Sequence, residues 1–156
     1  MDRSKSHARG NRVSATESGI AVHDVRSEVS TDTVWDTRGA GIVIHNLAWC
    51  VVRDNAVSRA GLDGIVCEAG ATVVARRNRM IRCERAGILA TTASHPDLGR
   101  SDDRGLNAID ENREAAVSNE LSATVSAIGN WWGSDPPDPF TFHGSADYAD
   151  WLSAPE

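Results

Sequence analysis

A five-residue motif recurs four times, as GIAVH (19–23), GIVIH (41–45), GIVCE (64–68) and GILAT (87–91). Successive motifs lie 22, 23 and 23 residues apart. Within each motif the side chains can alternate between two faces, as in a short β-strand. Helical repeats need more than about 30 residues and propeller blades about 40 or more, and the regular Leu pattern of a leucine-rich repeat is absent. The period therefore predicts an all-β parallel solenoid in which each repeat is one coil.

Other series of residues keep the same period. Equivalent positions of successive coils stack about 4.8 Å apart, so each series predicts a column of side chains. The motifs give two inward columns: Ile20, Ile42, Ile65 and Ile88, and Val22, Ile44, Cys67 and Ala90. A polar series predicts a hydrogen-bonded ladder at a turn: Asn11, Thr33, Asn55 and Asn78. Two more apolar series accompany it: Val13, Trp35, Val57 and Met80, and Val29, Val51 and Val74.

Composition excludes several classes of protein. The 156 residues carry a formal charge of −6, which argues against binding to a nucleic-acid backbone. No apolar run approaches the roughly 20 residues of a membrane span. The polar start is followed by no apolar stretch, so we expect no secretory signal peptide. The three cysteines cannot all pair with one another and match no zinc motif; we expect reduced, partly buried thiols.

The C-terminal segment resembles a known family. It contains Gly129-Asn-Trp-Trp-Gly133, a Pro-rich turn, Gly144-Ser-Ala-Asp-Tyr148 and Trp151-Leu152. This order is similar to the closing segment of secreted bacterial and archaeal β-helix proteins with pectate-lyase-like repeats, from which it departs at Gly129, Ala146 and Asp150. The resemblance implies a right-handed parallel β-helix of about five or six coils of 22–23 residues, and an extracellular or periplasmic location. It does not imply one activity, because the superfamily includes lyases, hydrolases and non-catalytic binders.

The expected organisation has three parts. Residues 1–10 are predicted to be disordered or an incomplete N-terminal segment. Residues 11–132 form the β-helix, with a charged loop inserted at 94–106. Residues 133–156 form a C-terminal cap, and aromatic side chains there or just before it are expected to cover the last coil: Trp131, Trp132, Phe140, Phe142, Tyr148 and Trp151. An N-terminal coil without its own cap would favour a truncated member of such a family or a homo-oligomer formed through that coil.

Three residues at equivalent positions could ligate a metal. His23, His45 and Glu68 each lie three residues after the isoleucine of their motif, and they are expected to point outward. Two imidazoles and a carboxylate are ligand types of zinc or copper sites. The alternative is a solvated column in which these side chains only pair weakly.

Acidic and basic residues form a second candidate site. The period places Thr31, Arg53 and Arg76 in one column, and Asp32, Asp54 and Arg77 in the next. In polysaccharide lyases of this fold, carboxylates hold calcium against an acidic sugar and a basic residue abstracts a proton, so the resemblance suggests Asp32, Asp54 and Arg76 as catalytic residues. Arg53, Arg76 and Arg77 could bind an anionic glycan. The pectate-lyase hallmark motifs are absent, and the alternative is a surface of complementary charges.

Two further features carry weaker hypotheses. The inserted loop holds charged residues that could act in acid–base hydrolysis or form only a polar excursion: His95, Asp97, Arg100, Asp102, Asp103 and Arg104. Trp35 and Trp49 are expected in the wall or core, and an exposed one would offer a sugar-stacking platform. Three functions thus stay open: a polysaccharide-binding protein, which we favour, a lyase or glycosidase acting on an acidic glycan, and a structural scaffold.

Overall fold

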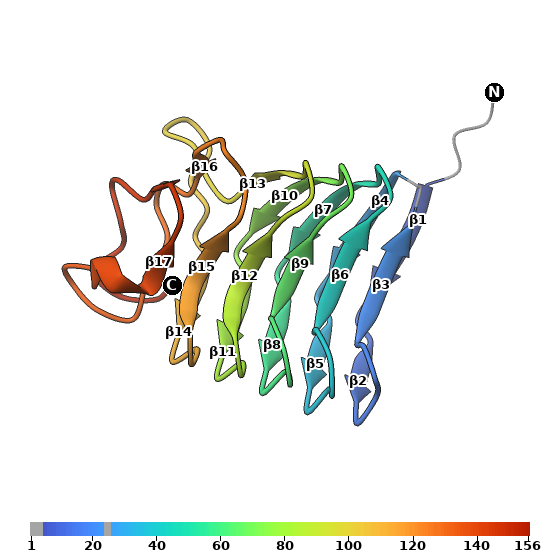
Figure 1. Ribbon diagram of the computed structural model, residues 1–156. Coiled ribbons are helices and arrows are strands. Elements are labelled where there is room, and N and C mark those ends of the chain that lie inside the picture. Colours follow the sequence, from blue (N-terminus) through green and yellow to red (C-terminus); the bar gives the residue numbers. More distant parts are fainter. Residues whose placement is uncertain (1–4, 24–25) are drawn as a thin grey trace.

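The chain folds into a parallel β-solenoid whose successive coils stack their strands into three sheets, named A, B and C, of seven, five and six strands (Figure 1). The computed structural model describes residues 5–23 and 26–156. Sheet C has six strands, so the solenoid has about six coils. All pairings between these strands are parallel, which confirms the predicted all-β solenoid.

Sheets A and C continue to the C-terminal strands β18 and β17, whereas sheet B ends at β14. Sheet A contains β1 (Lys5–Arg9), β4 (Arg26–Ser30), β7 (Trp49–Arg53), β10 (Thr72–Arg76), β13 (His95–Asp97), β16 (Val125–Ser126) and β18 (Ala146–Asp147). Sheet B contains β2 (Arg12–Ser14), β5 (Thr33–Trp35), β8 (Ala56–Ser58), β11 (Arg79–Ile81) and β14 (Ala108–Asp110). Sheet C contains β3 (Ile20–His23), β6 (Ile42–His45), β9 (Ile65–Cys67), β12 (Ala86–Ala90), β15 (Ala115–Asn119) and β17 (Phe142–His143). A single 3₁₀ turn, η1 (Pro139–Thr141), lies near the C-terminus of the described chain.

The repeated motif forms sheet C and fills the core. The predicted columns are confirmed, since Ile42 pairs with Ile20 and Ile65, and Ile44 pairs with Val22 and Cys67. Ile42, Ile65 and Ile88 have no solvent exposure. Burial of one such side chain contributes about 1.5–3 kcal/mol. The glycine before each isoleucine is required by the close approach of successive coils, because a Cβ at Gly41 would lie 2.7 Å from the carbonyl oxygen of Gly64.

A ladder of buried polar side chains joins the coils between sheets A and B. Asn55 donates from its Nδ2 to Asn78 Oδ1 (2.9 Å) and to the carbonyl of Val29 (3.0 Å). Asn78 repeats this pattern with Asn107 and the carbonyl of Val52. Each step thus satisfies buried donors and acceptors that would otherwise destabilise the fold. The complete ladder is Asn11, Asp32, Asn55, Asn78, Asn107 and Asn130.

The predicted position of Thr33 in this ladder is wrong, because Asp32 occupies it. The step from Asn11 to its ladder partner is 21 residues, whereas the next two steps are 23. Thr33 instead pairs with Ala56, and Val34 rather than Trp35 faces the core beside Val57. The predicted column of Val29, Val51 and Val74 is also wrong by one residue, since Val29 pairs with Val52 and not with Val51.

The N-terminal segment and the inserted loop both differ from their predicted structure. Residues 5–9 form β1, which pairs with β4 along its whole length, where a disordered or incomplete segment was predicted for 1–10. Residues 1–4 of that segment lie outside the described residues. Strand β13 lies inside the predicted loop at 94–106 and continues sheet A, and Leu98 after it is buried. The rest of this loop, residues 98–106, is an excursion from the coil. It lengthens the step from Asn78 to Asn107 to 29 residues.

Only some of the predicted cap aromatics cover the last coil. Trp132 is buried and meets Phe142 edge-on at 4.9 Å between ring centroids, and Phe142 stacks on Tyr148 at 4.1 Å. Phe140 is 85% exposed, and Trp151 is partly exposed with its Nε1 donating to Asp135. Strands β17 and β18 extend sheets C and A, so the cap also pairs the backbone of the preceding strands.

Asp32 is the weak step of the ladder, and Asp32→Asn is expected to stabilise the protein. Its Oδ1 accepts from Asn11, but its Oδ2 is buried without a hydrogen-bond partner, where an asparagine would present a donor. Supplying that donor should raise the free energy of unfolding by about 1–3 kcal/mol. Urea denaturation measures this change. Asn78→Asp is the matched control and should unfold at lower urea; a lower midpoint for Asp32→Asn would contradict the ladder argument.

Candidate functional site on the outer face of sheet A

Sheet A presents an outer face of alternating residues from three neighbouring strands. In β4, β7 and β10 every second side chain is buried, and those between them face outward. The outward positions carry one aromatic ring and several charged groups, among them Arg26, Glu28, Trp49, Arg53 and Arg76. On this face, polar side chains therefore surround the exposed ring of Trp49.

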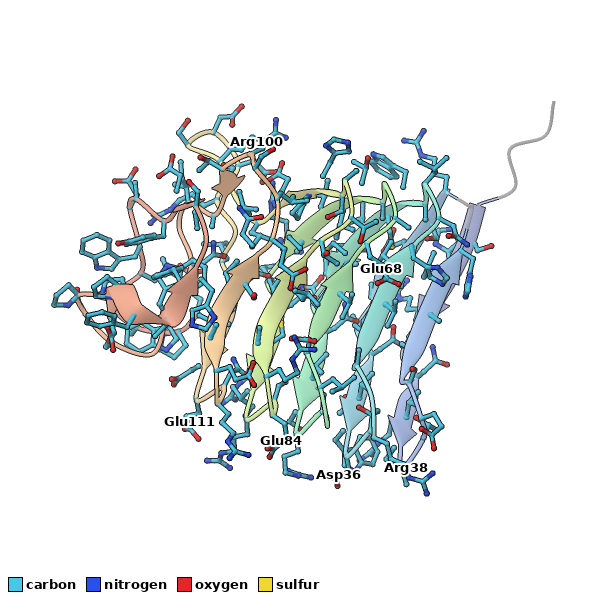
Figure 2. The ribbon with its side chains drawn as sticks, viewed as in Figure 1. Asp36, Arg38, Glu68, Glu84, Arg100 and Glu111 are labelled. Carbon is cyan, nitrogen blue, oxygen red and sulfur yellow. The ribbon has the colours of Figure 1, made fainter. Side chains whose placement is uncertain are left out.

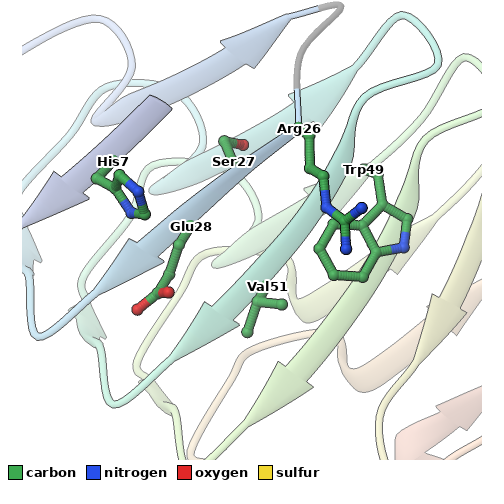
Figure 3. A pocket seen from close by; sticks show the side chains of 6 residues that line it. All are labelled: His7, Arg26, Ser27, Glu28, Trp49 and Val51. Atoms are coloured by element: carbon green, nitrogen blue, oxygen red, sulfur yellow. The ribbon is translucent and has the colours of Figure 1, made fainter. Parts of the chain in front are cut away.

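A pocket of about 220 Å³ opens on this face (Figure 3). Trp49 forms one wall and is 37% exposed, and the guanidinium of Arg26 lies over its ring at 4.4 Å from the centroid. The remaining lining comes from β1, β4 and β7: His7, Ser27, Glu28 and Val51. The pocket thus combines a flat apolar surface with a cation, an imidazole and a carboxylate, which are groups that bind hydroxyl-rich or anionic ligands.

Next to the pocket, ion pairs run across three coils. Arg53 donates to Glu28 (2.7 Å) and to Asp54 (2.8 Å). Arg77 donates to both oxygens of Asp54, at 2.7 and 3.1 Å. Hydrogen bonds from Arg77 and Arg53 hold the pKa of the Asp54 carboxyl below its usual range. Arg53 and Arg77, predicted to bind an anionic glycan, are therefore already paired with carboxylates.

A second charge cluster surrounds Arg76. Its side chain is only 8% exposed and donates to Asp97 (3.0 Å) and Asp103 (2.7 Å), as well as to the carbonyls of Ala75 and Asp97. Arg100 completes the cluster with a contact to Asp97 of 2.8 Å. A hydrogen bond from Arg76 lowers the pKa of Asp103. Through these contacts Arg76 holds the excursion after β13 against sheet A.

The structure does not bring the predicted catalytic residues together. Ser30, not Thr31, pairs with Arg53 and so shares the column of Arg76, and the predicted register was therefore wrong by one residue. Asp32 is 1% exposed in the ladder beside Asn55, while Asp54 lies in the turn and its backbone N–H donates to the carbonyl of Arg76. Asp54 and Arg77 share the predicted column and pair with each other, but Thr31 rather than Asp32 lies at the equivalent position of the preceding coil.

The predicted metal ligands lie on the outer face of sheet C, and two of the three meet. His23 and His45 are register partners, with their Nε2 atoms 2.9 Å apart. Glu68, labelled in Figure 2, follows β9 at the next position. Its backbone N–H donates to the carbonyl of Ile44. Within residues 5–23 and 26–156, no group of three or more His, Cys, Asp or Glu side chains is arranged to hold a metal ion.

The cysteines take no part in this face. All three are buried and free. Burial raises the pKa of the Cys67 thiol to about 12, and those of Cys50 and Cys83 to about 11. Reactive thiolates at neutral pH are therefore not expected from them.

Most residues of the pocket were not predicted from the sequence. Trp49 was predicted to be a platform if exposed, but Arg26, Glu28 and His7 were not predicted as site residues. The available signal was spacing: Arg26 and Trp49 are one 23-residue coil apart, and they pair in the sheets. Because the outward direction of Trp49 depends on the register of β7, the spacing alone did not place it on the surface.

Comparison with known families agrees with the fold. A family model described as the right-handed beta helix region matches residues 1–102. The chain therefore belongs to the right-handed β-helix family. No curated protein and no solved structure matches it significantly. In the part of the chain that the structure describes, no helix has the length and hydrophobicity of a membrane span.

Arg76→Ala is expected to lower the free energy of unfolding, and not only to remove a charge from the surface. It would leave Asp97 and Asp103 without their shared cation, and loss of one partner from a largely buried pair costs about 3–5 kcal/mol, less here because Asp103 is half exposed. Arg77→Ala is the matched control. Its side chain is 51% exposed, so its loss should cost under about 1 kcal/mol. Equal urea midpoints for the two variants would contradict a structural role for Arg76.

Proposed function

We propose that this protein binds a polysaccharide along the outer face of sheet A. The observation that carries the proposal is the exposed Trp49 ring in a pocket lined by Arg26, Glu28 and His7. A flat aromatic surface contacts the C–H face of a sugar ring, and charged side chains at its edge hydrogen-bond the hydroxyl groups. Because Arg26 covers part of the ring, the sugar would contact its exposed part and accept hydrogen bonds from the guanidinium.

The shape of the face suits a chain-like ligand. Sheet A has seven strands, which at the spacing of a β-sheet span about 29 Å. A polysaccharide lying across the strands would meet the Trp49 pocket first and then the ion pairs of Arg53, Asp54 and Arg77. Those pairs are exchangeable with ligand hydroxyl or carboxylate groups, because Arg77 is half exposed.

The proposal is tested with a panel of acidic and neutral polysaccharides, with and without calcium, by retention in affinity electrophoresis. Trp49→Ala should weaken binding by about tenfold or more, because it removes the stacking surface. Trp35→Ala is the matched control: Trp35 is half-buried in sheet B, and Arg12 lies 5.7 Å from its ring centroid. Equal weakening by both variants, or retention of neither the native chain nor its variants on any glycan, would contradict binding on sheet A.

The same panel separates binding from catalysis. Reducing ends and the absorbance of unsaturated uronates report hydrolase and lyase products. Product formation that is lost in Asp54→Ala would replace the proposed binding function with an enzyme acting on an acidic glycan. Absence of both retention and product would favour a scaffold.

A further inference from the structure

Two histidines form a close pair on the opposite wall from the sugar-binding proposal. His23 ends β3 and His45 ends β6, and the two residues are register partners in sheet C. Their Nε2 atoms are 2.9 Å apart and their ring centroids 3.7 Å apart, with an angle of 63° between the rings. His23 is exposed and His45 half-buried, so a solute can reach both rings.

The separation of the two nitrogens indicates a particular coordination geometry. Imidazole nitrogens bind first-row metals at about 2.0–2.1 Å. Two such nitrogens at a right angle are about 2.9 Å apart, whereas a tetrahedral angle separates them by about 3.4 Å. The observed 2.9 Å is the length of the hydrogen bond between the two rings of the metal-free pair. Neighbouring corners of a square plane, the arrangement preferred by Cu²⁺ and Ni²⁺, have the same separation, so binding would rotate the rings with little change in the distance between the nitrogens.

The fold holds the pair in place before any metal arrives. The preceding residues, Val22 and Ile44, are buried in the core and pair with one another, so the backbone of both histidines is fixed in adjacent coils. In the metal-free pair one Nε2–H donates to the other Nε2. Binding of both nitrogens to one ion needs that proton to move to Nδ1 of the same ring, a tautomer exchange that water can carry out without net release of a proton.

We propose that His23 and His45 bind one divalent transition-metal ion of square-planar preference, Cu²⁺ or Ni²⁺, on the outer face of sheet C. Water fills the remaining positions. Glu68 occupies the next register position but is no part of a three-ligand group, so the two imidazoles are the protein ligands. This site lies on another sheet than Trp49, and His23 lines a hollow together with His7 and Glu28 of the Trp49 pocket.

The test is titration of the full chain with Cu²⁺, followed by calorimetry and by electron paramagnetic resonance. The native chain should bind one ion with two nitrogen ligands, and bind Zn²⁺ more weakly. His23→Gln and His45→Gln should each weaken Cu²⁺ binding by about a hundredfold, because the second ligand no longer acts intramolecularly. His143→Gln, which changes a histidine of β17 in the same sheet, is the matched control and should bind like the native chain.

Other outcomes would overturn the site. Equal Cu²⁺ affinity in the native chain and in both His23→Gln and His45→Gln would show adventitious binding. Tighter binding of Zn²⁺ than of Cu²⁺ would refute the square-planar assignment, and a large loss in Glu68→Gln would refute the two-ligand site. Thermal unfolding supplies a second readout: Cu²⁺ should raise the Tm of the native chain and of His143→Gln, and leave that of His45→Gln unchanged.

Discussion

Successive coils of this protein are aligned by one polar ladder, and the rest of the structure depends on it. Asn55, Asn78 and Asn107 each accept a hydrogen bond from the backbone N–H of the preceding ladder residue and donate one to a carbonyl of sheet A. They therefore fix both the stacking of the coils and the turn between two sheets. The residue before each ladder position adopts a left-handed backbone, as Thr31, Asp54 and Arg77 do. A shift of one residue would bury the wrong side chains, which the ladder makes costly.

The candidate sites follow from that alignment. Because β4, β7 and β10 are held in one register, Arg26 comes to lie over Trp49, and Glu28 reaches Arg53. The same constraint in sheet C brings His23 onto His45. A solenoid therefore forms a surface by repeating one step along its axis, and residues one coil apart in the sequence become neighbours. The proposed sugar-binding and metal-binding surfaces are centred on different sheets, with Trp49 in sheet A and the histidine pair in sheet C.

The types of the charged residues can be taken from the sequence, but their roles depend on the folded structure. The sequence supplied the right residue types for a lyase-like site, but the structure uses most of them to hold the fold. Arg76 is buried against two aspartates of the excursion after β13, and Asp32 fills a ladder position. Opposite charges at neighbouring coil positions pair with one another unless a ligand competes, and spacing alone does not reveal which pairs are satisfied.

The sequence by itself determined the solenoid, its coil length and the two inner columns of the repeated Gly-Ile motif. The Gly-Ile period does this because a buried isoleucine column and a glycine too crowded for a side chain allow only one stacking of coils. Only the tertiary structure decided which side chains lie on the outer surface. The 21-residue step from Asn11 to Asp32 differs from the 22-residue step between the first two motifs, and that one-residue difference moved Thr33, Trp35 and Val29 out of their predicted columns. In a β-strand a one-residue slip turns every side chain to the other face, so only the folded register could show that Trp49 faces solvent beside Arg26.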